Sequence, residues 1–232
     1  MPHGPNQGWS AWGLGHMIRL MAVAGFGLAL WAAPAAAEVH DSGPDGFAVR
    51  ATAVVPAGAQ ETWAELLDPA DWWDGTHTFS GDAAQLSLDA RAGGCFCELL
   101  PNAKDPQGKP RGGVQHLQVV YVEEPRVLRM TGALGPMQSE PVTGVLTFVL
   151  KPEDGGTRIN AEYAIGGYLR MPIERIAPVV DRVIGEQVAR LAAKLGAAPA
   201  APVEDTVPPP SPAPASASDA PATPAKAPII GR

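Results

Sequence analysis

Two cysteines separated by a single residue are the most distinctive candidates for chemistry in this chain. Cys95 and Cys97 stand in the run GCFCELL and are the only cysteines of the sequence. On a strand, residues i and i+2 point to the same face, but their side chains are held farther apart than a disulfide prefers. In an oxidising compartment, however, two cysteines suggest a disulfide. We therefore expect buried free thiols first, a local disulfide second and metal ligation last.

Two histidines are the next candidates, because imidazole titrates near neutral pH and can act as a general acid or base. His77 and His116 are the only histidines between residues 46 and 196. Their spacing fits no zinc pattern, and the two cysteines alone would leave a zinc site incomplete, so we expect no metal. No carboxylate is placed by its spacing to orient either ring. A hydrogen-bonded structural role is therefore favoured over catalysis.

Motifs of the common catalytic and cofactor sites are absent from the sequence. It contains no G-x-S-x-G elbow, no H-E-x-x-H, no P-loop and no dinucleotide-binding fingerprint. We therefore assign no catalytic residue and expect no cofactor.

Aromatic side chains close to the histidines suggest the lining of a pocket. An aromatic wall suits an apolar or ring-containing ligand, although core packing is an open alternative for each of these residues. The candidate ligand-binding residues are Trp72, Trp73, His77, Phe79, His116, Tyr121, Tyr163 and Tyr168.

Both ends of the chain differ in composition from a folded domain. Residues 1–37 read as an N-terminal extension and a secretory signal peptide, with Arg19 before an apolar run at 21–31 and small residues at 35–37. Cleavage is expected after Ala37, which would leave no stable membrane span. Residues 197–232 are dominated by Pro and Ala, so we expect a disordered tail. The net charge of −7 argues against a nucleic-acid partner.

Between residues 46 and 196 the sequence predicts a folded domain that begins with strands. The run FAVRATAVV (47–55) alternates and is rich in β-branched residues, which predicts a strand. Two short helices are expected next, at 58–68 and 69–75. Strand-like runs divided by Gly, Pro and Asp then cover 78–81, 84–90, 94–100, 113–124, 126–134, 143–153 and 156–167.

The last segment, 171–195, changes to helical periodicity. Its apolar residues fall at i, i+3, i+4 and i+7 spacing, and charged residues take most of the other positions. We expect Pro178 to start or kink this helix and Gly196 to end it. The apolar stripe consists of Ile173, Ile176, Val180, Val183, Ile184, Val188, Leu191 and Leu195.

This order predicts an α+β fold. Consecutive strands with short turns favour an antiparallel sheet, and a helix with one apolar stripe must cover one face of it. We predict a curved antiparallel sheet of about six to seven strands wrapped around the long C-terminal helix, with two short helices after the first strand. A space left between sheet and helix would be a ligand cavity.

Three local sequence motifs resemble those of a known protein superfamily. VVPAGAQETWAELLDPADWWDG (54–75) is similar to the entry motif V-A-P-x-x-V-W-x-x-L-x-D-P-x-x-W-W, and GCFCE is similar to a strand that commonly reads G-G-x-F-x-E. VVYVEEPRVLRMTGALGP (119–136) is similar to the hairpin V-x-x-x-x-P-x-x-L. The segment thus resembles the START-like, or SRPBCC, superfamily with its helix-grip fold. That superfamily includes lipid carriers of the pollen-allergen type, polyketide cyclases and activator-of-chaperone-ATPase domains.

The resemblance implies a cavity that binds small hydrophobic or aromatic molecules, and it carries over no catalytic residues. We expect a periplasmic or secreted START-like protein that holds a small hydrophobic ligand, and we favour a binding protein over an enzyme. One alternative is a cyclase- or dehydratase-type enzyme that uses a cavity His or Tyr as acid and base. Another is an interaction module that assists a second envelope protein, whose identity the sequence does not indicate.

Overall fold

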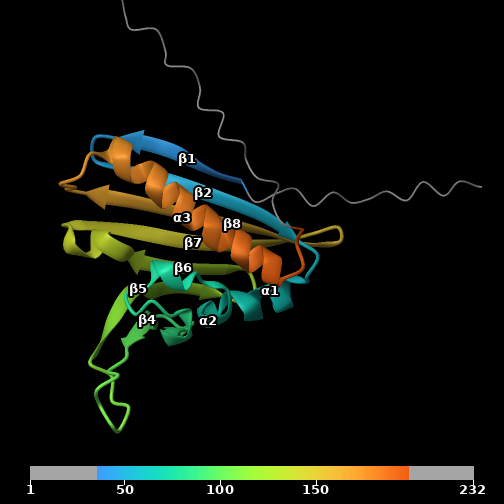
Figure 1. Ribbon diagram of the computed structural model, residues 1–232. Coiled ribbons are helices and arrows are strands. Elements are labelled where there is room, and N and C mark those ends of the chain that lie inside the picture. Colours follow the sequence, from blue (N-terminus) through green and yellow to red (C-terminus); the bar gives the residue numbers. More distant parts are fainter. Residues whose placement is uncertain (1–35, 199–232) are drawn as a thin grey trace, which may run out of the picture.

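Alternating burial along the long strands shows that one face of the sheet packs on a core. In β2 (Gly46–Val55) and in most of β8 (Gly156–Gly167), every second side chain is buried, as the two-residue period of a strand requires. The computed structural model describes residues 36–198. Within them, eight strands form one antiparallel sheet in the order β1-β2-β8-β7-β6-β5-β4-β3 (Figure 1).

The other elements have the following bounds. The remaining strands are β1 (Ala36–Gly43), β3 (Leu86–Leu88), β4 (Cys95–Leu100), β5 (Gly112–Glu123), β6 (Val127–Gly132) and β7 (Val142–Glu153). The α-helices are α1 (Ala59–Leu66), α2 (Pro69–Trp72) and α3 (Ile173–Lys194), and the 3₁₀ turns are η1 (Gly75–His77), η2 (Ala83–Gln85) and η3 (Gly135–Ser139). The predicted α+β class is confirmed, with one long antiparallel sheet, two short helices after the first predicted strand and a long C-terminal helix.

One strand of the sheet, β1, was not predicted from the sequence. It precedes the predicted domain start at residue 46 and pairs antiparallel with β2 at the edge of the sheet. Its side chains from Glu38 to Gly43 are all exposed, so the segment shows no alternation of apolar and polar residues. The predicted signal core at 21–31 and nearly all of the predicted tail lie outside the described residues.

Two further predictions are corrected by the structure. Residues 78–81 do not form a strand, because the backbone N–H groups of Phe79 and Ser80 donate to the side chain of Glu98 rather than to a neighbouring strand. Pro178 does not start the long helix, since α3 begins at Ile173 and runs through it.

The placement of α3 determines where a cavity can form. The helix packs mainly on β2 and β1, at one end of the sheet, as Figure 1 shows. At the other end, α2 lies against β3 and the chain from Trp73 to Gln85 follows it. α2 and α3, which cover the two ends of the sheet, contact each other. No helix of residues 36–198 is long and apolar enough to cross a membrane.

Candidate functional site

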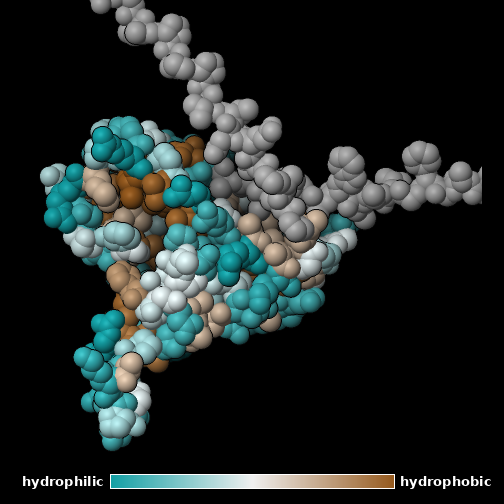
Figure 2. All heavy atoms as spheres, in the orientation of Figure 1, coloured by the Kyte–Doolittle hydropathy of each residue, from teal (hydrophilic) through white to brown (hydrophobic). Residues whose placement is uncertain are grey.

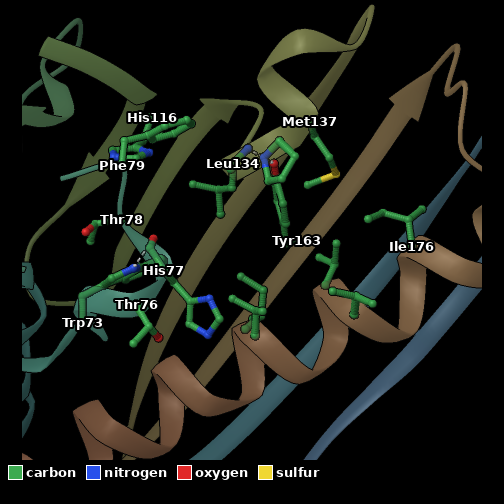
Figure 3. A pocket seen from close by; sticks show the side chains of 16 residues that line it. Trp73, Thr76, His77, Thr78, Phe79, His116, Leu134, Met137, Tyr163 and Ile176 are labelled. Atoms are coloured by element: carbon green, nitrogen blue, oxygen red, sulfur yellow. Dashed lines mark hydrogen bonds between the residues drawn. The ribbon is translucent and has the colours of Figure 1, made fainter. Parts of the chain in front are cut away.

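A cavity of about 500 Å³ lies between α3, η3, the η1 loop and the sheet. Its size is in the range of pockets that hold small organic molecules. Apolar atoms form most of its wall, and the space-filling view shows hydrophobic residues gathered in a hollow of the surface (Figure 2). The close-up shows side chains from α3 and from the opposite loops converging on this space (Figure 3).

The helical wall of the cavity is built by the apolar stripe of α3. The residues at helical spacing on this face are Ile176, Val179, Val180, Val183 and Ile184. Val180 and Ile184 are buried, whereas Val179 is 41% exposed and stands at the mouth. Other members of the stripe, Val188 and Leu191, are fully buried in the core, so the stripe both lines the cavity and packs on the sheet.

Tyr163 holds the opposite wall in place. Its ring is completely buried on β8, and its hydroxyl donates to the carbonyl of Gly132 at 3.2 Å and accepts from the N–H of Leu134 at 3.0 Å. Burial raises the pKa of Tyr163 to about 12. Gly144 on β7 leaves the room for this ring, because a Cβ at that position would overlap it. Tyr163 thus fixes the segment that leads into η3, whose Met137 also lines the cavity.

Glu98 is a buried carboxylate behind the cavity wall. Its side chain on β4 has no exposed surface and accepts hydrogen bonds from the backbone N–H groups of Phe79 and Ser80 and from the ring of His116. Burial by itself raises the pKa of Glu98, but the hydrogen bonds from Ser80, Phe79 and His116 outweigh burial and bring the pKa below its ordinary value. The group is therefore ionised at neutral pH.

His116 reaches the cavity because β5 carries a β-bulge. On the neighbouring strand β4, Phe96 pairs with Leu117 and the next residue, Cys97, pairs with Gln115. His116 therefore has no partner on β4 and is the extra residue of the bulge. Both His116 and Leu117 are buried in consequence, although neighbours on a regular strand point to opposite faces. Burial lowers the pKa of His116, and the hydrogen bond from its Nε2 to Glu98, 2.9 Å long, offsets only part of that effect. The ring is neutral at neutral pH.

His77 occupies a different position, at the mouth of the cavity. Its Nε2 lies 3.3 Å from a carboxylate oxygen of Glu186 on α3, and both side chains are partly exposed. The backbone carbonyl of His77 accepts a hydrogen bond of 3.3 Å from Nε1 of Trp73. The pair of His77 and Glu186 therefore joins the η1 loop to α3 across the opening.

The structure brings five of the predicted site residues together and places three elsewhere. Trp73, His77, Phe79, His116 and Tyr163 all line the cavity. Trp72 is buried in the core beside a void of about 10 Å³. Tyr121 lies on the outer face, where its hydroxyl donates to Glu123, because a second register shift in β5 turns it outward. Tyr168 follows the end of β8 and is 69% exposed.

Sequence reasoning missed several residues of the site. Leu134 to Met137 contribute a wall but lie in a segment without periodicity. Glu98 was overlooked although a signal was present: it alternates with Phe96 on β4, so both point to the concave face. Thr76 and Thr78 complete the rim next to His77.

Cys95 and Cys97 form a disulfide, so the prediction of free thiols is wrong. A regular strand would separate the two Cα atoms by about 6.6 Å, but they are 5.3 Å apart, within the usual range for a disulfide. The contraction coincides with the register shift between β4 and β5 at Phe96 and Cys97. The described residues contain no cluster of three or more potential metal ligands.

No family model and no curated protein matches the chain. Several solved structures are similar to it. The crystal structure of CalU16 from Micromonospora echinospora is 16% identical, covers 72% of this chain and 85% of its own, and has a TM-score of 0.44. Its solution NMR structure is 16% identical over 77% of this chain and 83% of its own, with a TM-score of 0.46.

Two other solved structures have a comparable likeness. An uncharacterized protein from Rhizobium leguminosarum is 15% identical over 69% of this chain and 97% of its own, with a TM-score of 0.45. Protein Ms6760 from Mycobacterium smegmatis is 18% identical over 71% of this chain and 99% of its own, with a TM-score of 0.45. Likeness of this degree carries no argument about a ligand or an activity. The helix-grip arrangement therefore rests on the sheet and α3 themselves.

Proposed function

We propose that the protein binds a small, uncharged and largely apolar molecule in the cavity between α3 and the sheet. The observation that carries this proposal is the cavity of about 500 Å³ with its mainly apolar wall. Removing apolar ligand surface from water contributes about 25 cal/mol per Å². A ligand the size of two fused aromatic rings, with about 250 Å² of apolar surface buried, would gain about 6 kcal/mol before the entropic losses of binding.

The charges around the cavity support a neutral ligand. No Lys or Arg is among the residues that line it. The carboxylate of Glu98 lies directly behind His116, and that of Glu186 lies beside His77 at the mouth. An anionic ligand, such as a fatty acid, would meet the carboxylate of Glu98, for which the cavity wall supplies no compensating Lys or Arg.

A second candidate, an acid–base enzyme of the cyclase or dehydratase type, is favoured by one observation, the contact between His116 and Glu98. Catalysis through an oxyanion also needs donors aimed at the developing charge. The hydroxyl of Tyr163 donates to a backbone carbonyl, as does that of Thr78, and the hydroxyl of Thr76 donates to Asp74. Binding is therefore the better supported function.

We further propose that the protein acts outside the cytoplasm. The pattern of Arg19, an apolar run and small residues before Glu38 supports this proposal, and the disulfide of Cys95 and Cys97 is compatible with an oxidising compartment. Fractionation of the producing cells tests it. Mature protein in the periplasm or medium that begins at Glu38 is expected, whereas a cytoplasmic full-length chain would refute export.

A titration with the neutral fluorophore N-phenyl-1-naphthylamine tests the binding function. We expect saturable binding by the wild type and at least a tenfold loss in Val183→Trp, because the indole fills the cavity. Val145→Trp on the outer face of β7 is the matched control, since Val145 is 39% exposed and does not line the cavity. Equal binding by both variants would contradict the proposal.

A further inference from the structure

We infer that the ligand is a neutral aromatic molecule with a hydroxyl or N–H donor, and that Nδ1 of His116 accepts the hydrogen bond from this donor. This inference rests on the proposed function and deepens it. It follows from the tautomer of His116, from the absence of a hydrogen bond to Nδ1 within the described chain, and from the polar groups of the cavity wall.

The tautomer of His116 is determined by Glu98. One oxygen of Glu98 accepts from the N–H of Ser80, and the other accepts from the N–H of Phe79 and lies 2.9 Å from Nε2 of His116. An ionised carboxylate can only accept hydrogen bonds, so Nε2 must carry the proton in this contact. In a neutral imidazole the other nitrogen, Nδ1, then has a lone pair and no proton.

Nδ1 is available to a ligand. It makes no hydrogen bond to any residue of the described chain, and it is not among the fully buried polar atoms that lack a partner. The remaining exposed surface of His116 is only 5%, and the residue lines the cavity. Nδ1 therefore keeps accessible surface next to the cavity that His116 lines, so a hydrogen-bond donor of a ligand can reach it.

The other polar side chains of the wall limit what the ligand can be. The hydroxyl protons of Thr76, Thr78 and Tyr163 are already donated to the protein. The wall thus offers an acceptor at His116 and no free hydroxyl donor, which favours a ligand with a donor over a ketone or ether. His77 at the mouth is the one other side chain with a titratable nitrogen in the wall.

Aromatic rings surround the acceptor and favour a flat ligand. The ring centroid of His116 lies 5.9 Å from that of Phe79 and 5.1 Å from that of Phe96. Trp73 in turn packs edge-on against Phe96, with centroids 5.3 Å apart. Such spacings are typical of stacked and edge-to-face pairs. A planar ring that enters the cavity would continue this cluster while its hydroxyl meets Nδ1.

Two naphthalene probes, one with a hydroxyl donor and one in which a methyl group replaces the hydroxyl proton, test the inference. Binding of 2-naphthol and of 2-methoxynaphthalene is measured by calorimetry with the wild type and with His116→Phe, which keeps an aromatic ring but removes the acceptor. One hydrogen bond to a neutral acceptor corresponds to a preference of about 3- to 10-fold. We expect the ratio of the two dissociation constants to shift by about this factor in favour of 2-naphthol in the wild type relative to His116→Phe. Tyr121→Phe, outside the cavity, should keep the wild-type ratio.

The outcomes separate this inference from the proposed function. If both probes bind but the ratio is the same in wild type and His116→Phe, the donor inference fails and the binding function stands. If neither probe binds the wild type, the binding function fails and the inference fails with it. Should His116→Phe not fold, ¹⁵N NMR of the wild type decides. 2-Naphthol should move the Nδ1 resonance of His116 to lower frequency and 2-methoxynaphthalene should not; an unmoved resonance overturns the inference.

Discussion

Nε2 of His116 on β5 lies 2.9 Å from Oε2 of Glu98 on the neighbouring strand β4, and both side chains are almost completely buried. This contact joins the cavity wall to the loop at residues 79–80, because the same carboxylate accepts two backbone N–H groups there. The carboxylate of Glu98 has no Lys or Arg partner among the described residues and is held in the interior by three hydrogen-bond donors, the N–H groups of Phe79 and Ser80 and Nε2 of His116. The stability of the site and its chemistry therefore depend on the same two residues.

Removal of the carboxylate should strongly destabilise the fold. Glu98→Ala leaves two backbone N–H groups and Nε2 of His116 buried without an acceptor, which should lower the free energy of unfolding by about 3 kcal/mol. Urea unfolding measures the loss. Glu123→Ala is the control, since Glu123 pairs with Arg126 on an exposed surface and such pairs contribute little. Equal effects of the two substitutions would contradict the account of Glu98.

Stability should fall as the pH is lowered from neutrality. The pKa of His116 is below its ordinary value in the folded protein because of burial, so below pH ~6.5 the unfolded chain binds more protons and folding becomes less favourable. The contribution is lost progressively as the pH falls from about 6.5 through the folded pKa. The lowered pKa of Glu98 acts in the same direction at lower pH, below about 4.5.

Urea midpoints measured between pH 7.5 and 5.5 test this dependence. We expect a decrease for the wild type that is reduced in His116→Phe. A flat profile, or the same slope in the variant, would show that His116 is not held in its neutral form.

Loss of the hydroxyl of Tyr163 should loosen one wall of the cavity. Tyr163→Phe leaves the N–H of Leu134 and the carbonyl of Gly132 without their partner, and a loss of about 1–2 kcal/mol is expected. Hydrogen exchange should accelerate most at residues 133–137, which precede and enter η3. Tyr168→Phe, on an exposed side chain, should leave exchange unchanged. Uniform acceleration over the whole sheet would argue against a local role.

Reduction of the disulfide should cost modest stability and leave the cavity intact. Cys95 and Cys97 close a very short loop, for which chain entropy gives about 1.5 kcal/mol. Both lie on the face of β4 opposite Phe96 and Glu98. A reducing agent should therefore lower the urea midpoint of the wild type without abolishing binding of N-phenyl-1-naphthylamine, and should not affect Cys95→Ala/Cys97→Ala. A wild-type midpoint insensitive to the reductant would refute the disulfide.

The fold was largely predictable because its main signals are periodic. Alternation along β2, β7 and β8 and the helical stripe of α3 each identify an element and its buried face. The exposed edge strand β1 has no such alternation. The segment 78–81 has strand-like composition but folds as a loop, because a distant carboxylate, Glu98, binds its backbone.

The site was only partly predictable because its geometry depends on bulges and long-range contacts. Aromatic type and position indicated Trp73, Phe79 and Tyr163, which do line the cavity. The register shift that turns Tyr121 outward leaves no mark in the sequence. The pairing of His116 with Glu98 likewise depends on the bulge in β5, which only the strand register reveals.

The location of a bound ligand tests the central claim most directly. In protein with ¹³C-labelled methyl groups, intermolecular NOEs from 2-naphthol identify the residues that touch it. The cavity account predicts NOEs to methyl groups of Leu134 on one wall and of Ile176 and Val183 on α3. NOEs confined to the exposed Met171, close in sequence to the exposed Tyr168, would contradict it.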